Sequence, residues 1–569
     1  MVDWLAVAGG PLVESTLLEL MHASDDQSIG RLCARGVCDR RAGVVDFRHP
    51  LARDVAYKAL DPSNKKRMHR LLGEHLAQTP LASGLSAAIV ARHLARGDAG
   101  AQAGALYLEA AKAARQSNQM KLALRFYDNA LSFLPEEHPE RMKAHESLEA
   151  LFRHLGRRRE RRRHLEALRR LARRDGRARW AAVALLRTAR LELDDSMLAR
   201  ALPVAQKASE AARLAKNPAL EVEALTLLSE ILRDLGDTQG AIAACDSALE
   251  VSGRGRLPPR AHAEVLRAKG VLLRYVGRVE EAVDAYVEAL AVFRAVGARR
   301  SEARVLTALA FAMFVLERFE DVIALGVASV RIDSSLGGRF QTAKTLSNVG
   351  QAYARLGDLR RGLGFLERAR ERHERYADQD SRTDTLLCTA GILLEAGDVD
   401  GAHTLVSDAR ALVAVTGSLY DTVHERIMRA CLHRAMNEPA VAVALASEAR
   451  QVAESQGLIS FHIYATAVEA AARVAAGEVH AGVLLARMAL GAVEAVGNSE
   501  YGIEVRALAC EALAKGGVGK HDDAHARAVA HVRRVAQHVR SAELRAAFLR
   551  RPMVLKIMRQ AGGEPPSAD

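Results

Sequence analysis

The chain has 569 residues, of which 49% are hydrophobic, only 4% are aromatic and 14 are proline. This length excludes a single compact core, because such cores stop growing near roughly 250 to 300 residues, and it requires several domains or an open repeat array. Ala, Leu, Arg and Glu dominate the sequence and favour helix almost throughout. The formal net charge is +12, and its largest block lies at Arg157–Arg174, where ten of eighteen residues are Arg.

Cysteine usage and apolar runs argue against a secreted or membrane protein. The six cysteines are scattered, and the one close pair, Cys33 and Cys38, has no further Cys or His nearby. This is neither a zinc pattern nor a disulfide framework, and we expect both to be small buried residues. No basic leader precedes the first apolar stretch, and the longest apolar run, about 305–316, is too short to span a bilayer. We therefore expect a soluble, cytoplasmic protein.

Residues 1–75 form the first predicted domain and differ from everything that follows. Two helix candidates lead to a short β-like stretch at 43–49, which is followed by Pro50 and by helix candidates at 51–60 and 65–76. This order of helix, helix, short strand pair and further helices resembles a winged-helix region. We expect a small winged-helix-like module here.

From about residue 76 to 550 the sequence repeats itself. An apolar run, a polar turn and a renewed helix recur, with turn residues spaced by 41 residues once and then by 40 each time: Gly236, Gly277, Glu317, Gly357, Gly397, Asn437 and Gly477. The same step reaches Gln116 upstream and Gly517 downstream. A fixed period of this length predicts a solenoid of stacked helix pairs, in which neighbours bury the apolar faces that one pair cannot.

Small residues recur at three fixed offsets from each turn, as in Gly270, Ala282 and Ala289 around Gly277. These offsets resemble the small-residue positions of the tetratricopeptide repeat (TPR). The resemblance implies an all-α, right-handed α-α superhelix of about eleven helix pairs. The period is 40 rather than 34 and the closing Pro is missing, so we expect longer helices or longer loops. Residues 551–569 are expected to form a C-terminal cap and a disordered tail.

Several stretches, among them HPLARDVAY, ARHLARGDAGAQAGALYLEAA, GGRFQTAKTLSNVGQAYARLGD and SEYGIEVRAL, resemble the C-terminal part of large bacterial serine/threonine kinases of the kind found in myxobacteria. Those proteins place a kinase domain first, an AAA-type ATPase second and TPR-like repeats last. The module at 1–75 is similar to the winged-helix region that follows the nucleotide-binding core in signalling ATPases of the STAND type. The resemblance implies that this chain is a truncated or stand-alone sensing tail.

The sequence contains no motif for catalysis, cofactor binding or metal binding. It has no G-x-x-x-x-G-K-[ST] phosphate loop, no kinase glycine loop, catalytic loop or D-F-G, and no H-E-x-x-H. We therefore expect no enzyme, no cofactor and no metal site in this chain. His521, His525, His531 and His538 are interpreted as exposed histidines of a weakly packed terminal segment.

The Arg-rich block could contact phosphates, and its candidate basic patch consists of Arg157, Arg158, Arg159, Arg161, Arg162 and Arg163. Aromatic residues that would stack on bases are nearly absent from the block. Glu160 and Glu166 offer partners on the same segment. We favour a solvated surface or an acidic protein partner over nucleic acid.

The candidate binding groove follows from the TPR resemblance, because positions two, five, six and nine of the first helix of a TPR point inward. In two successive repeats these positions select Arg304, Thr307, Phe311, Lys344, Ser347, Asn348 and Gln351. Lys344 and Asn348 could bind a carboxylate, and the alternative is an ordinary wet groove wall.

The leading functional hypothesis is a non-catalytic regulatory module of a signal-transduction system, which binds a protein or peptide in this groove. A small-ligand sensor of a STAND-type regulator is the alternative. A DNA-binding transcription regulator has less support.

Overall fold

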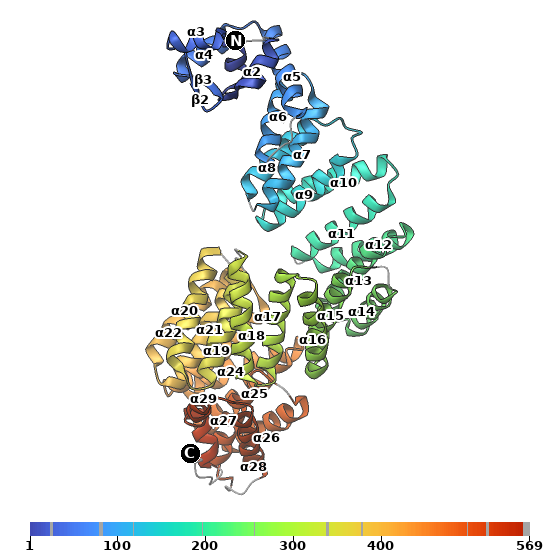
Figure 1. Cartoon of the computed structure of the whole chain (residues 1–569). Coiled ribbons are helices and arrows are strands. Elements are labelled where there is room, and N and C mark those ends of the chain that lie inside the picture. The colour runs from blue at the N-terminus through green and yellow to red at the C-terminus, as the bar shows by residue number, and fades with distance from the viewer. Residues whose placement is uncertain are drawn as a thin grey trace. The chain divides into compact units, whose positions relative to one another are not determined.

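The computed structural model describes residues 1–22, 27–78, 84–117, 119–195, 197–254, 257–336, 341–376, 379–497, 499–518 and 523–560. The chain divides into two compact units, Met1–Leu227 and Leu228–Asp569. Both consist mainly of helices packed in consecutive pairs (Figure 1). Each unit is described by itself.

The first unit begins with the winged-helix-like module. Its elements are α1 (Val2–Ala8), β1 (Leu12–Val13), α2 (Glu14–Met21), α3 (Gln27–Ala34), β2 (Cys38–Arg41), β3 (Val44–Phe47), α4 (Pro50–Ala59) and α5 (Pro62–Gln78). The antiparallel sheet has the order β1-β3-β2, with Val45 opposite both Leu12 and Arg40. The strand pair and the two helices after it lie close to their predicted places, whereas three helices precede the pair where the sequence predicts two, and the first strand was not predicted.

One hydrophobic core holds this module together. Leu5, Leu17, Ile29 and Val45 are fully buried in it, and α5 contributes Leu72. Cys38 is also fully buried, as expected, whereas Cys33 packs against the core but is only partly buried. Because α5 runs on to Gln78, the predicted domain limit at 75 falls inside this helix.

The rest of the first unit is helical: α6 (Gly84–Arg96), α7 (Gly100–Gln116), α8 (Met120–Phe133), α9 (Glu140–His154), α10 (Arg158–Arg174), α11 (Ala178–Asp194), α12 (Leu198–Leu214) and the first part of α13 (Pro218–Asp234). Tyr107, Tyr127 and Leu148 lie in the core that α6 to α9 share.

The second unit continues with α14 (Thr238–Gly253), α15 (Pro259–Tyr275), α16 (Val279–Ala295), α17 (Arg299–Val315), α18 (Phe319–Ser335), α19 (Gln341–Arg355), α20 (Leu359–Tyr376), α21 (Gln379–Ala396) and α22 (Val399–Thr416). It ends with α23 (Leu419–Ala435), α24 (Pro439–Ser455), α25 (Ile459–Ala475), α26 (Val479–Val496), α27 (Gly502–Lys515), α28 (Asp523–Gln537), α29 (Ala542–Leu549) and α30 (Pro552–Gln560). The predicted tail at 561–569 lies outside the described residues.

Longer helices explain the period of 40. α15, α16 and α17 each have 17 residues. Two such helices and two three-residue connections make up one repeat. The sequence left longer helices and longer loops open, and the structure selects the helices.

The seven central turn residues have positive φ angles: Gly236 84°, Gly277 83°, Glu317 55°, Gly357 84°, Gly397 87°, Asn437 60° and Gly477 88°. Gly517 does too (81°), whereas Gln116 is the last residue of α7. This left-handed conformation lets the helix end in a cap, because the next amides can bond back to its last carbonyls. The Gly277 amide donates to the Arg274 carbonyl (3.2 Å) and the Arg278 amide to the Leu273 carbonyl (2.9 Å). Glycine suits this conformation best, and asparagine is the usual substitute.

The predicted small positions lie where helices touch. Gly270, Ala310 and Ala390 are buried, as are Ala289 and Ala369 on the second helices of their pairs. At Gly270 a Cβ atom would lie 2.5 Å from a ring carbon of the fully buried Tyr286. Any side chain there would therefore push α15 and α16 apart.

Among the described helices, α26 is the one with the length and apolarity of a membrane span, and 28% of that stretch is buried. It occupies an ordinary repeat position, because it packs against α25 and α27 through Ala486, Ala489 and Leu490.

Two pairs of buried histidines join neighbouring helices of the first unit. His69 on α5 and His93 on α6 place their Nδ1 atoms 2.9 Å apart, and His145 on α9 and His164 on α10 place theirs 3.0 Å apart. Burial lowers the pKa of His69 to about 4 and that of His93 to about 3. Burial likewise lowers the pKa of His145 to about 3 and that of His164 to about 4.

We predict that Gly270→Ala lowers the free energy of unfolding by about 1–3 kcal/mol, because the added methyl overpacks the contact with Tyr286. Gly491→Ala is the matched control, since Gly491 is exposed on α26 with nothing within 4 Å of the new Cβ. It should be neutral or stabilise by about 0.5–1 kcal/mol. Chemical denaturation of the full chain measures both effects, and equal stability of the two variants would contradict the packing account.

We predict that acid selectively weakens the first unit. The folded-state pKa values of the four histidines lie below the unfolded value of 6.5, so their neutral form stabilises the fold above pH 6.5. This stabilisation is lost as the pH falls toward 4 and 3, because protonation then favours unfolding. The melting temperature of the wild-type chain should fall over this range, and His145→Leu/His164→Leu should reduce the dependence. An unchanged pH profile of that variant would contradict the prediction.

Candidate functional site

The last four helices of the second unit also pack against its earlier repeats, although α27 still stacks on α25 and α26 as the next helix of the array. A single core contains Phe314 on α17 and Leu356 after α19 together with Ala507 on α27, Val532 on α28 and Phe548 on α29. Phe314 and Phe548 are more than 200 positions apart in the sequence. The C-terminal helices thus cover part of the inner surface of the repeats.

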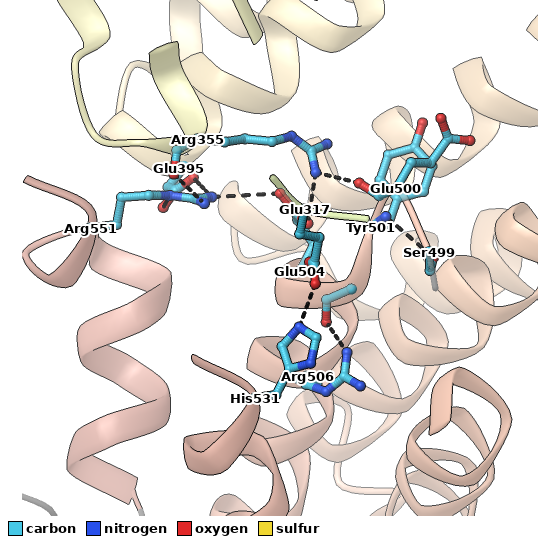
Figure 2. A network of polar contacts seen from close by, with 11 residues as sticks. Glu317, Arg355, Glu395, Ser499, Glu500, Tyr501, Glu504, Arg506, His531 and Arg551 are labelled. Carbon is cyan, nitrogen blue, oxygen red and sulfur yellow. Dashed lines mark hydrogen bonds and ion pairs between the residues drawn. The ribbon is translucent and has the colours of Figure 1, made fainter. Parts of the chain in front are cut away.

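Two nearly buried arginines lie at the centre of this contact, as Figure 2 shows. Arg551, at the start of α30, bonds to both carboxylate oxygens of Glu395 on α21, at 3.0 and 2.7 Å, and donates to the carbonyl of Arg355. Arg355, the last residue of α19, contacts Glu504 on α27 at 3.3 Å and donates to the carbonyl of Glu500. Glu504 also lies 3.5 Å from Arg551.

Opposite charges keep this network ionised despite its burial. Burial alone would raise the pKa of Glu395, but Arg551 outweighs it and holds that pKa below its usual range. Burial alone would lower the pKa of Arg551, but Glu395 and Glu504 raise it. Removing one partner would leave an unpaired charge in the core.

Further polar contacts join the C-terminal helices to the repeats. Glu511 on α27 accepts from Arg434 on α23 (3.2 Å), from Lys515 and from Lys556 on α30, and these cations overcome burial and lower its pKa to about 2. His531 on α28 pairs with Glu317.

His531 and His525 are therefore not exposed, and this part of the sequence interpretation was wrong. His525 is 0% exposed and His531 is 6% exposed. Both histidines lie on the buried face of α28 beside alanine and valine, so their contacts come from tertiary packing that the local sequence does not show. His538 is exposed, and His521 lies outside the described residues.

The covered inner surface encloses a cavity of about 240 Å³. Its wall comes from α17, α19, α21 and α23, and the segment before α27 closes one side. The lining residues are Phe311, Phe314, Lys344, Ser347, Asn348, Gln351, Arg355, His373, Ser381, Asp384, Thr385, Cys388, Ser418, Tyr420, Asp421, Glu500 and Tyr501. A cavity with convergent polar and aromatic groups is the usual form of a small-molecule site.

Five of the seven predicted groove residues line this cavity: Phe311, Lys344, Ser347, Asn348 and Gln351. The other two make contacts within the repeat wall. Arg304 lies 3.6 Å from Glu264, and the Thr307 hydroxyl lies 2.9 Å from those of Ser329 and Thr345.

The sequence analysis did not predict the cavity residues beyond α19, although the 40-residue period could have indicated them. One repeat position recurs every 40 residues as Glu264, Arg304, Lys344, Asp384, His424, Tyr464 and Glu504. Extending the groove prediction beyond Lys344 by this step would have found Asp384 on the wall and His424 next to it. Neighbours in the column interact, since His424 Nδ1 lies 3.6 Å from Asp384 Oδ1.

The closing segment contributes an aromatic ring and a carboxyl group. The ring of Tyr501 stacks on Tyr464 with centroids 4.5 Å apart, and the guanidinium of Arg355 lies 5.7 Å from its centroid. Burial raises the pKa of the neighbouring Glu500, and the charge of Asp384 raises it further. Donors such as Lys344 and acceptors such as Asp384 and Glu500 thus face one small volume.

Within the described residues, Asp384, Cys388 and His424 offer three ligand atoms that all lie within 4.8 Å of one another. The sequence analysis assigned no metal ligand and singled out none of the three. They are the residues of this site that could hold an ion.

The predicted basic patch lies at the start of α10 in the first unit, where acidic residues pair with much of it. Arg161 is buried between Glu149 (3.0 Å) and Asp194 (2.9 Å), and Arg158 and Arg162 both contact Asp195. Arg157 lies 3.6 Å from Glu160, while Arg159 and Arg163 are exposed.

No family model matches this chain, and no curated relative matches its sequence. Similar solved structures include BtubC (BKLC) from P. vanneervenii, at 22% identity over 39% of this chain and 92% of that chain, with a TM-score of 0.35. A STAND protein with a tetratricopeptide repeat sensor from Pyrococcus horikoshii matches at 12% identity over 79% and 62%, with a TM-score of 0.41. The apo form of RapI matches at 12% identity over 48% and 99%, also with a TM-score of 0.41. All three TM-scores lie below 0.5, so the fold assignment rests on the helix pairs, turns and small positions described above.

We predict that Arg551→Ala destabilises the second unit by about 3–5 kcal/mol, because it leaves Glu395 buried without its partner. Arg550→Ala is the matched control, because Arg550 directly precedes Arg551 in the sequence and its side chain is exposed. Arg551→Lys should give an intermediate loss of stability, because lysine keeps the charge but cannot make the bidentate contact with Glu395. Chemical denaturation, together with limited proteolysis of the C-terminal helices, measures the stability of each variant. Equal stability of Arg551→Ala and Arg550→Ala would contradict the network's role.

Proposed function

We propose that this chain is a non-catalytic interaction or sensor module of a signal-transduction protein, and that its cavity binds a small polar molecule. The observation that carries the proposal is the convergence of five groove residues and the Glu500–Tyr501 segment on one cavity of about 240 Å³. The repeat wall supplies specificity, and the closing segment encloses the ligand.

The lining groups favour a small molecule that carries a carboxylate. Lys344 extends from α19 into the cavity with an exposed side chain. One turn further along, Asn348 is buried, and its amide makes no hydrogen bond to any described residue. An ammonium and an amide donor side by side can bind both oxygens of a carboxylate.

A peptide or protein in the same groove is the second candidate. It is favoured by the exposure of Arg304 and Lys344 along the repeat face. An extended peptide that ran along α19, α21 and α23 would have to displace Glu500 and Tyr501, which hold one side of the cavity closed. A small ligand requires no such displacement.

The proposal also includes the signalling protein to which this module would belong. The resemblance to kinase–ATPase–repeat proteins and the winged-helix order of elements in α1 to β3 support a sensing tail that acts on an upstream enzyme. In this arrangement the ligand stabilises the closed form of the second unit, and a protein partner responds to that change.

We predict that a screen of small carboxylates finds a compound that raises the melting temperature of the full chain saturably, because a ligand that binds only the folded state stabilises it. Lys344→Ala/Asn348→Ala should weaken this compound at least about tenfold, which corresponds to about 1.4 kcal/mol. Arg300→Ala, which removes an exposed positive charge elsewhere in the second unit, should leave the shift unchanged.

Two results would contradict the proposal. One is a complete screen without a saturable shift, and the other is a compound that stabilises the double variant as strongly as the wild type. Calorimetric titration of the compound distinguishes specific binding from a general solvent effect.

A further inference from the structure

Asp384, Cys388 and His424 come together because of the repeat. Asp384 and Cys388 are separated by one helical turn on α21, so both side chains lie on the same side of that helix. His424 lies on α23, one period of 40 residues after Asp384, at the equivalent position of the next repeat. Stacking of the two repeats therefore places an imidazole beside a carboxylate and a thiol.

The distances suit tetrahedral coordination. The Cys388 Sγ atom lies 3.8 Å from Asp384 Oδ1, and His424 Nδ1 lies 3.6 Å from the same oxygen. Ligand atoms around one tetrahedral zinc ion are separated by about 3.3–3.8 Å, given bonds of about 2.0–2.3 Å. The third pair of ligand atoms, on Cys388 and His424, lies within 4.8 Å.

A second observation points to a missing partner. His424 is 1% exposed, and its Nδ1 atom has no hydrogen-bond partner among the described residues, since 3.6 Å is too long for a hydrogen bond. Buried imidazole nitrogens are normally satisfied, and an orphan aimed at a carboxylate and a thiol requires an explanation. An ion held between the three groups would satisfy it.

The surrounding charges allow a cation. Asp384, Asp421 and Glu500 place three carboxyl groups at the wall of the cavity, which Lys344 and Arg355 also line. Burial alone would raise the pKa of Asp384, but His424 and Lys344 outweigh it and lower that pKa.

We propose that Asp384, Cys388 and His424 form a binding site for a divalent transition-metal ion, for which Zn²⁺ fits best. One sulfur, one nitrogen and one oxygen ligand match its borderline-soft character. Binding forms a bond from the ion to Sγ of Cys388 and releases the thiol proton to solvent. Three protein ligands leave a fourth position for water or another small ligand. The site does not depend on the carboxylate ligand proposed above.

Cobalt titration of the full chain tests the proposal. After treatment with a chelator, the protein should bind one Co²⁺ with the visible bands of a tetrahedral site and a near-ultraviolet band from thiolate-to-cobalt charge transfer, and Zn²⁺ should displace it. Cys388→Ser should abolish the charge-transfer band, and His424→Gln should lower the affinity at least ~10-fold. Cys431→Ser and His433→Gln, on the neighbouring α23, are matched controls that should change neither.

A second readout needs no variant. Zn²⁺ should protect Cys388 from alkylation, measured by peptide mass spectrometry, and should leave Cys33 in the first unit as reactive as before. The proposal is overturned if cobalt does not bind at one equivalent, if the charge-transfer band survives Cys388→Ser, or if Zn²⁺ fails to protect Cys388. Lys344→Ala/Asn348→Ala should keep the metal site, so failure of the carboxylate proposal and failure of the metal proposal give different results.

Discussion

Two nearly buried arginines, Arg355 and Arg551, share the carboxylate of Glu504, and the arrangement of the second unit depends on this contact. Arg355 ends α19, Glu504 lies in α27 and Arg551 immediately precedes α30, so three distant parts of the chain meet at one point (Figure 2). Each charge is costly to bury alone and tolerable only beside its partners. Because no two of these helices are neighbours in sequence, the contact determines where the C-terminal helices lie.

The cavity is a consequence of this closure. Glu500 and Tyr501 immediately precede α27, and the carbonyl of Glu500 accepts from Arg355. The contact that attaches α27 therefore also places Tyr501 against Tyr464 and beside His424. A ligand in the cavity would touch Glu500 and Tyr501, the segment that helps to hold the C-terminal helices in place. Ligand binding and the position of these helices are therefore connected.

Each repeat contains positions whose residue type maintains the fold and other positions whose residue type varies between repeats. Turn residues with positive φ and small residues between helices recur in every period, because no larger side chain fits at a position such as Gly270. The column that contains Lys344, Asp384 and His424 has the same place in each repeat, but its residue changes from each repeat to the next. A regular scaffold thereby presents an irregular row of donors, acceptors and possible metal ligands.

Much of the fold could be predicted from the sequence, because turns and helix contacts are local and recur. Gly397 and Ala390 are examples, and five groove residues followed from the TPR pattern. The closure could not be predicted, because Arg355 and Glu504 are 149 residues apart and neither belongs to a motif. For the same reason the burial of His525 and His531 was missed. Asp384 and His424 could have been found by extending the 40-residue step.

The return of the C-terminal helices onto the repeats is tested most directly by disulfide trapping. Arg540, between α28 and α29, contacts Asp321 on α18 at 2.8 Å, and its amide donates to Glu320. In a Glu320→Cys/Arg540→Cys chain, mild oxidation should join the two positions in most folded molecules, as mapped by peptide mass spectrometry, while either single substitution gives no such link. Linkage no faster than in the urea-unfolded chain would show that the C-terminal helices do not close onto the repeats.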